Sequence, residues 1–175
     1  MDQAGTARMN VYIVRHAEAI DRGSGIPDAD RYLTPKGRSL FRKTAKNMIR
    51  AGAAPDVIVT SPLVRSVQTA EILCERMGFK GECLVSGELS PGFSLPGLRK
   101  ILSGLPPLRE IALVGHDPDL SDLLVSLLPL DDGFRLKKGA AVALHIDPSR
   151  LKSAAEFLWM ALGKRRIDSL DDLNG

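Results

Sequence analysis

The stretch Val11-Tyr12-Ile13-Val14-Arg15-His16-Ala17 decides the fold, because an apolar run ends directly in an arginine and a histidine. Its four apolar residues are rich in β-branched side chains and do not alternate with polar ones, as expected of a strand buried on both faces of a parallel sheet. The runs Val57-Ile58-Val59-Thr60 and Ile111-Ala112-Leu113-Val114 have the same layout. The three runs therefore predict the centre of an α/β sheet.

Helical segments separate the three runs. Thr34-Pro35 is expected to be the N-cap and first residue of a helix that ends at Gly52. Ser61-Pro62 repeats this signal before a second helix that ends at Gly78, and a third helix is expected to start near Pro118. This alternation predicts an α/β fold with helices on both faces of the sheet.

Weaker patterns complete the prediction. Residues 82–86 favour a short strand, and residues 97–103 favour a short helix. The apolar segments 141–146 and 156–161 flank a polar turn and are expected to pair as a hairpin, although a helix over 154–162 is the alternative.

The segment from Ala17 to Leu33 is polar, contains two glycines and one proline, and joins the first strand to the first long helix. Loops of about 12 residues or more are usually functional or disordered in compact domains. We interpret this loop as a candidate lid over a site, with a solvated connector as the alternative.

A chain of 175 residues, 44% of them hydrophobic and 26% charged, has the size and composition of one compact domain. We expect a single domain over residues 1–175, with a flexible N-terminus at 1–9 and a tail at 164–175. The basic cluster Lys164-Arg165-Arg166 is interpreted as part of a solvated tail, with contact to an acidic partner surface as the alternative.

The first ten residues lack the apolar core of a secretory signal, and no apolar run reaches the roughly 20 residues that cross a bilayer. We expect a cytoplasmic protein that binds no membrane. The formal net charge of +3 suits an anionic substrate, but the charges are scattered, so nucleic acid is not expected as a partner. Cys74 and Cys83 form no C-x-x-C pair and are expected to pack in the core, without a disulfide or a zinc site.

Groups that can bind phosphate follow the carboxyl end of each predicted buried strand. Arg15-His16 follows the first strand, Ser61 and Arg65 follow the second, and His116 follows the third. Parallel strands place these ends along one edge of the sheet, and open α/β sheets bind ligands outside that edge. The sequence therefore predicts that these distant residues meet in one pocket.

Each residue type has a chemical reason to be in such a pocket. Arg15 and Arg65 offer planar, permanently charged forks that match phosphate oxygens. Cations beside His16 depress the pKa of its imidazole, which keeps the ring neutral and nucleophilic. His116 can donate a hydrogen bond to a non-bridging oxygen, and Ser61 is a further candidate for substrate binding.

A metal site is the competing interpretation of His16 and His116 near Asp117 or Asp119. We favour a site without metal, because two arginines at the same point repel a divalent cation and no H-x-x-x-H spacing is present. His145 belongs to the predicted hairpin and is expected to be structural.

The chain resembles the histidine phosphatase superfamily, which includes the phosphoglycerate mutases, and within it the phosphohistidine phosphatases of the SixA type. The motifs that carry the resemblance are the R-H pair in the stretch quoted above, Leu33-Thr34-Pro35-Lys36-Gly37, the run from Val59 to Ala70, and Val114-Gly115-His116-Asp117-Pro118. They occur in the order that the family shows, between about Asn10 and Leu128.

The resemblance implies a phosphoglycerate mutase-like, three-layer α/β/α sandwich with a mostly parallel central sheet, and no metal or organic cofactor. It also implies that His16 is the nucleophile, which forms a covalent phosphohistidine, and that Arg15, Arg65 and His116 bind the phosphoryl group.

Three departures from the family pattern stand out. Ala17 replaces the glycine after the catalytic histidine, and Asp117 stands where similar proteins often carry asparagine. Many members use a glutamate in an L-x-E pattern to protonate the leaving group, and here Pro91 occupies that place. Glu88 remains a candidate acid or base from three positions earlier. Without the usual acid, we expect preference for leaving groups that need little protonation.

The leading hypothesis is a metal-independent phosphatase that acts on a histidine-phosphorylated protein. A hydrolase of a nucleotide or another small phosphate ester or anhydride is the alternative enzyme. A module that recognises phosphate without cleaving it is the alternative outside enzymes. The sequence leaves the oligomeric state open.

Overall fold

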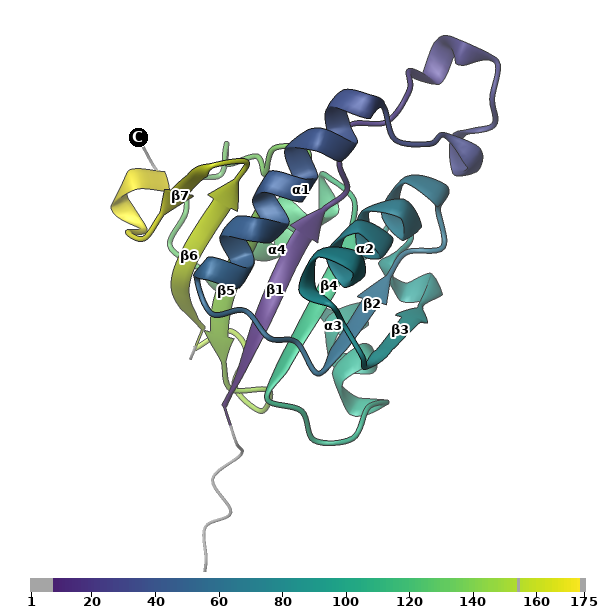
Figure 1. Cartoon of the computed structure of the whole chain (residues 1–175). Helices are drawn as coiled ribbons and strands as arrows, with labels where there is room; N and C mark the ends of the chain where they lie inside the picture. Colours follow the sequence, from purple (N-terminus) through teal and green to yellow (C-terminus); the bar gives the residue numbers. More distant parts are fainter. Residues whose placement is uncertain (1–7, 154, 174–175) are drawn as a thin grey trace, which may run out of the picture.

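The computed structural model describes residues 8–153 and 155–173. These residues form a seven-stranded sheet that carries α-helices on both faces (Figure 1). The strands are β1 (Met9–Arg15), β2 (Val57–Thr60), β3 (Glu82–Val85), β4 (Glu110–Gly115), β5 (Ala141–Ile146), β6 (Glu156–Leu162) and β7 (Arg165–Ile167). The α-helices are α1 (Pro35–Arg50), α2 (Val64–Met77), α3 (Leu95–Ser103) and α4 (Asp119–Leu127), and the 3-10 helices are η1 (Arg22–Ser24), η2 (Asp28–Asp30), η3 (Gly87–Leu89) and η4 (Asp171–Leu173).

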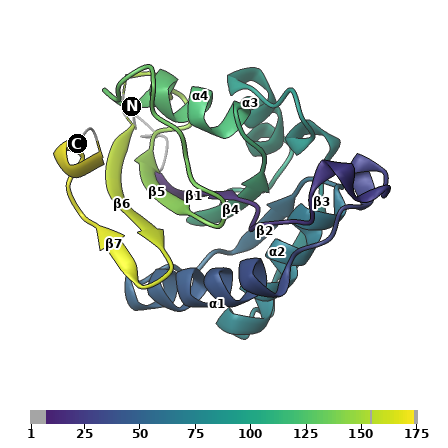
Figure 2. The ribbon, with the colours of Figure 1, turned by 90° about the horizontal axis from the view of Figure 1, so that it is seen from above.

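The strand order is β3-β2-β4-β1-β5-β6-β7. Strands β1 to β4 are parallel to one another, whereas β5, β6 and β7 continue the sheet in antiparallel pairs. Seen from above, α1 and α2 cover one face and α3 and α4 the other (Figure 2). The predicted α/β/α sandwich with a parallel centre is therefore confirmed.

The first strand shows why its apolar residues do not alternate with polar ones. Val11 and Ile13 pack in the cluster on the α3 and α4 side, and Tyr12 and Val14 pack in the cluster on the α1 and α2 side. All four residues are at most 2% exposed. Successive side chains of a strand point to opposite faces, so a strand covered on both sides needs an unbroken apolar run.

The motif Leu33-Thr34-Pro35-Lys36-Gly37 fixes the start of α1. The Thr34 hydroxyl accepts a hydrogen bond from the N–H of Gly37 at 2.9 Å, as expected of an N-cap. A Cβ at Gly37 would overlap the main-chain carbonyl of Glu18 and lie 2.9 Å from its nitrogen. Glycine is therefore needed where α1 passes the loop that follows β1.

The short elements agree with the sequence patterns. Strand β3, helix α3 and helix α4 form in the predicted segments, and β5 pairs with β6 as an antiparallel hairpin. The alternative of a helix over 154–162 is wrong, apart from residue 154, which lies outside the described residues. No described helix is long and apolar enough to span a membrane.

Three expectations need correction. The predicted tail at 164–175 is wrong for Arg165–Ile167, which forms β7 and pairs with β6, with the Ile167 side chain buried. Of the predicted flexible segment 1–9, residues 1–7 lie outside the described residues and Met9 already belongs to β1. Cys83 does not pack in the core, because β3 is an edge strand and leaves this side chain exposed.

Candidate active site

A pocket of about 730 Å³ opens at the carboxyl ends of the central strands. Its lining includes Arg15 at the end of β1 and His16 directly after it, Arg65 in the first turn of α2, and His116 after β4. Strands β2, β4 and β1 are neighbours in the sheet, so the segments that follow them meet at one edge. The predicted convergence of these four residues is present in the structure.

His16 is buried, with 7% of its surface exposed, and its tautomer is fixed by the main chain. Its Nδ1 lies 2.7 Å from the carbonyl oxygen of Ala17. Because a carbonyl can only accept, Nδ1 carries the proton and Nε2 keeps its lone pair. Burial, together with the positive charges of Arg65 and Arg15, lowers the pKa of His16 to about 3. The ring is therefore neutral at physiological pH, with a lone pair on Nε2.

His116 lies beside His16, with ring centroids 5.2 Å apart. Its Nε2 is 2.7 Å from the Ser61 hydroxyl and 3.3 Å from that of Ser66. The Ser61 oxygen already accepts a hydrogen bond from the N–H of Leu63, so its own hydrogen is free to point at Nε2. When that hydrogen points at Nε2, the proton of the neutral ring sits on Nδ1, which is buried and has no partner among the described residues.

The pKa of His116 is lowered to about 4, by burial first and by the charge of Arg65 next. The ring is consequently neutral near pH 7 and offers one N–H donor to a ligand in the pocket. Ser61 itself is fully buried and does not line the pocket. Its hydroxyl is directed at His116, and its role in substrate binding stays a prediction.

Arg15 is held by the segment between α4 and β5. Its Nη1 donates to the carbonyl of Leu136 at 2.6 Å and lies 3.6 Å from Oδ2 of Asp117. The same carboxylate oxygen accepts a hydrogen bond from Ser121 at 2.6 Å, so Asp117 orients Arg15. The Nε atom of Arg15 is buried without a partner in the described part of the chain.

Arg65 is 3% exposed, and its two terminal nitrogens contact Asp28 in the loop after β1. Its Nε is buried and, like that of Arg15, has no partner within residues 8–153 and 155–173. Two guanidinium nitrogens and one imidazole nitrogen of the pocket residues are therefore buried without a partner among the described residues. The sequence does not single out Asp28. Only the length of its loop indicated that this segment contributes to the site.

Glu88 does not lie in this pocket. It forms an ion pair with Lys100 and lines a separate pocket near β3 and α3. The acid or base role considered for Glu88 stays a prediction, and this position does not support it. Pro91, at the place of the L-x-E glutamate, does line the pocket with His16.

The remaining sequence predictions concern residues around the pocket. Ala17 is completely buried, and its N–H donates to the Thr69 hydroxyl at 3.0 Å, so the fold accommodates the methyl group that replaces the family glycine. His145 lies on β5, where Nδ1 is 2.7 Å from Oδ1 of Asn10. Among the described residues, no group of three or more His, Cys, Asp or Glu is arranged to hold a metal ion.

The loop from Ala17 to Leu33 contributes Ala19, Asp21, Arg22, Asp28 and Arg31 to the pocket lining. It stands above the carboxyl ends of the strands and folds into η1 and η2 (Figure 1). This position agrees with its interpretation as a lid, because side chains from its tip reach the site.

Comparison with known proteins identifies the family of the chain. The family model described as histidine phosphatase superfamily (branch 1) matches residues 11–89. An uncharacterized protein of Picosynechococcus sp. is 32% identical over 149 residues, which cover 83% of this chain and 90% of that protein.

Two further proteins are similar over much of the chain. The mitochondrial serine/threonine-protein phosphatase Pgam5 of Drosophila melanogaster is 30% identical over 72% of this chain, which spans 39% of that relative's length. The structure of the protein histidine phosphatase SixA complexed with tungstate superposes with a TM-score of 0.74, at 22% identity, over 89% of this chain and 97% of SixA. This last likeness concerns the fold.

Proposed function

The chain belongs to the histidine phosphatase superfamily (branch 1), and from this premise we propose that it hydrolyses the phosphohistidine of a phosphorylated protein. The proposed reaction passes through a covalent phosphoenzyme on His16. Its site residues are Arg15, Arg65 and His116, and it needs no metal or organic cofactor.

In the first step, Nε2 of His16 attacks phosphorus while the bond to the leaving group breaks. Nδ1 keeps its proton, which stays hydrogen-bonded to the carbonyl of Ala17. The ring therefore becomes a phosphoimidazolium without any transfer of that proton. The unpartnered Nε–H groups of Arg15 and Arg65 and the Nδ1–H of His116 are suited to the non-bridging oxygens. These donors stabilise the charge that develops in the transition state.

In the second step, water attacks the phosphoimidazolium and His16 leaves as a neutral imidazole. The low pKa of His16 favours this step, because the free ring is stable without a proton in the pocket. Inorganic phosphate is then the product, and the enzyme returns to its starting state.

The observation that carries the choice of substrate is the position of Glu88. Pro91 occupies the place of the usual acid at the pocket, and Glu88 is paired with Lys100 outside it. Four aspartates also line the pocket. Asp28 contacts Arg65, Asp117 accepts from Ser121 through Oδ2, and Asp119 accepts from the N–H of Gly92. Asp21 is exposed on the loop, and Oδ1 of Asp117 has no partner among the described residues. An imidazole leaves phosphorus with less help than an alkoxide does, which favours phosphohistidine.

A second candidate function is hydrolysis of phosphoserine or phosphothreonine in a protein. The similarity to Pgam5, whose name states this activity, favours it. It requires that one of the pocket aspartates protonate an alkoxide. Small phosphate esters and anhydrides remain the alternative substrates predicted from the sequence.

The test compares phosphate release from a histidine-phosphorylated carrier domain, a phosphoserine peptide, p-nitrophenyl phosphate and an alkyl phosphate, each with and without EDTA. Wild type is compared with His16→Ala and with His145→Ala, a matched control because His145 lies on β5 outside the pocket.

We expect fast release from the carrier domain, slow release from the alkyl ester, no effect of EDTA, and loss of turnover in His16→Ala only. An active His16→Ala variant would contradict the covalent mechanism. Equal kcat/KM values on all substrates would indicate that the leaving group is protonated in the pocket and would favour the second candidate. The cytoplasmic location stays a prediction.

A further inference from the structure

Asp28 binds the arginine that the proposed reaction assigns to the phosphoryl group. Its main-chain carbonyl accepts a hydrogen bond from Nη1 of Arg65 at 2.7 Å, and its Oδ2 lies 3.2 Å from Nη2. The Arg65 side chain is 3% exposed, whereas that of Asp28 is 50% exposed. Both terminal nitrogens of a buried guanidinium are thus occupied by one residue that solvent reaches.

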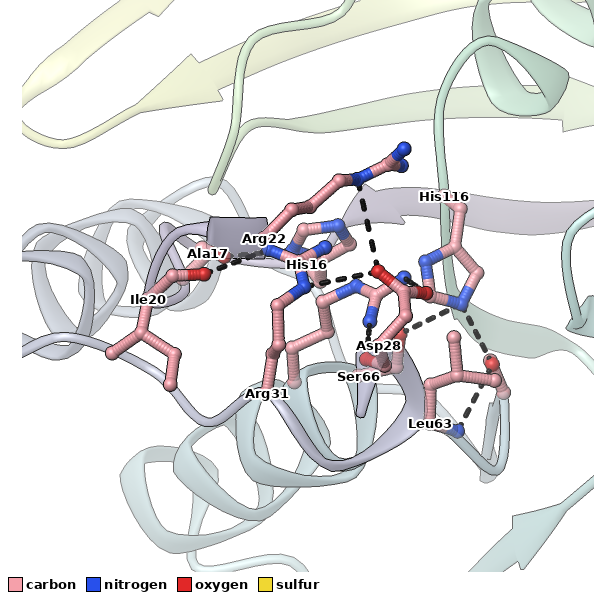
Figure 3. A network of polar contacts seen from close by, with 11 residues as sticks. His16, Ala17, Ile20, Arg22, Asp28, Arg31, Leu63, Ser66 and His116 are labelled. Atoms are coloured by element: carbon pink, nitrogen blue, oxygen red, sulfur yellow. Dashed lines mark hydrogen bonds and ion pairs between the residues drawn. The ribbon is translucent and has the colours of Figure 1, made fainter. Parts of the chain in front are cut away.

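Two further arginines hold the same carboxylate. Oδ1 of Asp28 lies 3.0 Å from Nε of Arg31 and 3.7 Å from Nε of Arg22. Figure 3 shows Asp28 beside these two side chains, with the rings of His16 and His116 close by. Burial opposes ionisation of Asp28, but the charges of Arg65 and Arg31 outweigh it and lower the pKa of the carboxyl. Asp28 therefore brings a negative charge to the anion site.

A carboxylate and a phosphoryl group compete for the edge of a guanidinium that Nη1 and Nη2 form. Each needs the same fork of N–H donors, and two anions within a few ångströms repel each other in a partly buried site. The Nε–H of Arg65 is free of Asp28, but a phosphoryl group that also takes the terminal nitrogens of Arg65 must displace the Asp28 carboxylate.

The loop is built so that Asp28 can move while its base stays in place. The base is closed by the N–H of Ile20, which donates to the carbonyl of Tyr32 at 2.9 Å, and by the N–H of Thr34, which donates to the carbonyl of Glu18 at 3.0 Å. In contrast, η1 and η2 at the tip contain no buried residue. Displacement of Asp28 therefore disturbs little of the packed structure.

We propose that Asp28 is an internal competitor for Arg65, which occupies the anion site in the free protein and is displaced by the phosphoryl group of the substrate. This inference rests on the proposed function. The competition weakens binding of every anion at this position. It also helps product release, because Asp28 returns to Arg65 as inorganic phosphate leaves.

The test measures tungstate binding by calorimetry at neutral pH, without turnover. Asp28→Asn keeps the size and the main-chain carbonyl of the residue but removes its charge. We expect tungstate to bind roughly tenfold more tightly, since a competing anion has been removed. Inhibition by inorganic phosphate should tighten by a similar factor. Asp30→Asn is the matched control, since Asp30 is exposed on the same short helix and forms no ion pair with any described residue.

The same change in an Arg65→Ala background completes a double-mutant cycle. The gain from Asp28→Asn should disappear there, because no guanidinium is left to compete for. Weaker tungstate binding in Asp28→Asn would show that Asp28 orients Arg65 and would overturn the proposal. An equal gain in Asp30→Asn or in the Arg65→Ala background would also overturn it, because the effect would be a general loss of negative charge.

The tungstate experiment and the hydrolysis experiment can fail separately, so failure of the competition is distinguishable from failure of the proposed function. If Asp28→Asn tightens tungstate binding but no phosphorylated substrate is hydrolysed, the competition is supported and the proposed function fails. If substrates are hydrolysed but tungstate binding does not tighten, the proposed function is supported and the competition is rejected.

Discussion

At the scale of single residues, the site depends on two imidazoles that stay neutral because they are buried among arginines. His16 and His116 have pKa values of about 3 and about 4, against an ordinary value of about 6.5. Their tautomers are set by different partners, a main-chain carbonyl for His16 and a serine hydroxyl for His116. One ring is left with a lone pair and the other with an N–H donor, as attack on phosphorus requires.

The two lowered pKa values predict how stability depends on pH. Between about pH 6.5 and pH 4 the unfolded chain binds protons on these histidines that the folded chain does not, so the free energy of unfolding falls as the pH falls. From pH 7 to pH 5 each histidine should account for a loss of about 2 kcal/mol. Urea unfolding of wild type and His16→Gln across this range measures it.

The His16→Gln variant should lose about half of that pH dependence, whereas His145→Gln should keep it. If the free energy of unfolding of His16→Gln fell with pH as steeply as that of wild type, this result would contradict the low pKa of His16 in the folded protein.

The Nδ1–H of His116 predicts a kinetic effect. His116→Asn should lower kcat by about two to three orders of magnitude, the usual effect of removing one donor to a developing negative charge. KM should change less, because Arg15 and Arg65 still bind the phosphoryl group. Steady-state kinetics with p-nitrophenyl phosphate measure both constants. Unchanged values of kcat and KM would show that His116 takes no part in the reaction.

At the scale of elements, the contact between α1 and the loop after β1 sets the position of the lid. Gly37→Ala should destabilise the protein by about 1 to 3 kcal/mol, because the new methyl group would overlap the carbonyl of Glu18. In an unobstructed helix the same change is favourable by up to about 1 kcal/mol. Urea unfolding measures the change in the free energy of unfolding, and its sign shows whether Gly37 lies against the carbonyl of Glu18.

Gly87→Ala is the control for this prediction, because a Cβ at that position meets nothing within 4 Å. It should leave the free energy of unfolding nearly unchanged. Stabilisation by Gly37→Ala would show that the loop and α1 do not touch in solution.

At the scale of the whole molecule, one sheet carries a packed layer on each face, and a single domain over 1–175 stays a prediction. Trp159 of β6 is buried and stacks on Tyr12 of β1, with ring centroids 5.7 Å apart. Trp159 is the only tryptophan in the chain, so its fluorescence reports on the join between the parallel and antiparallel parts of the sheet.

We expect tryptophan fluorescence and far-ultraviolet circular dichroism to give coincident urea transitions, as in two-state unfolding of a single domain. An early fluorescence transition would show that the antiparallel half of the sheet unfolds by itself and would contradict the single domain.

The sequence by itself determined the parallel centre of the sheet and the residues at its edge. Apolar runs such as Val11 to Val14 permit only strands buried on both faces, and parallel strands bring their carboxyl ends to one edge. For this reason Arg15, His16, Arg65 and His116 could be grouped from sequence although up to about 100 positions separate them.

The tertiary structure alone decided which other groups contact these four residues. Asp28 and Ser61 differ little from other polar residues in sequence, because a hydroxyl or carboxylate acquires its role from the atom it faces. Glu88 is close to the expected acid in sequence but pairs with Lys100, since the turn of η3 directs its side chain away from the pocket. Strand patterns follow from periodicity along the chain, whereas side-chain partners across a loop depend on the packing of segments that no local pattern connects.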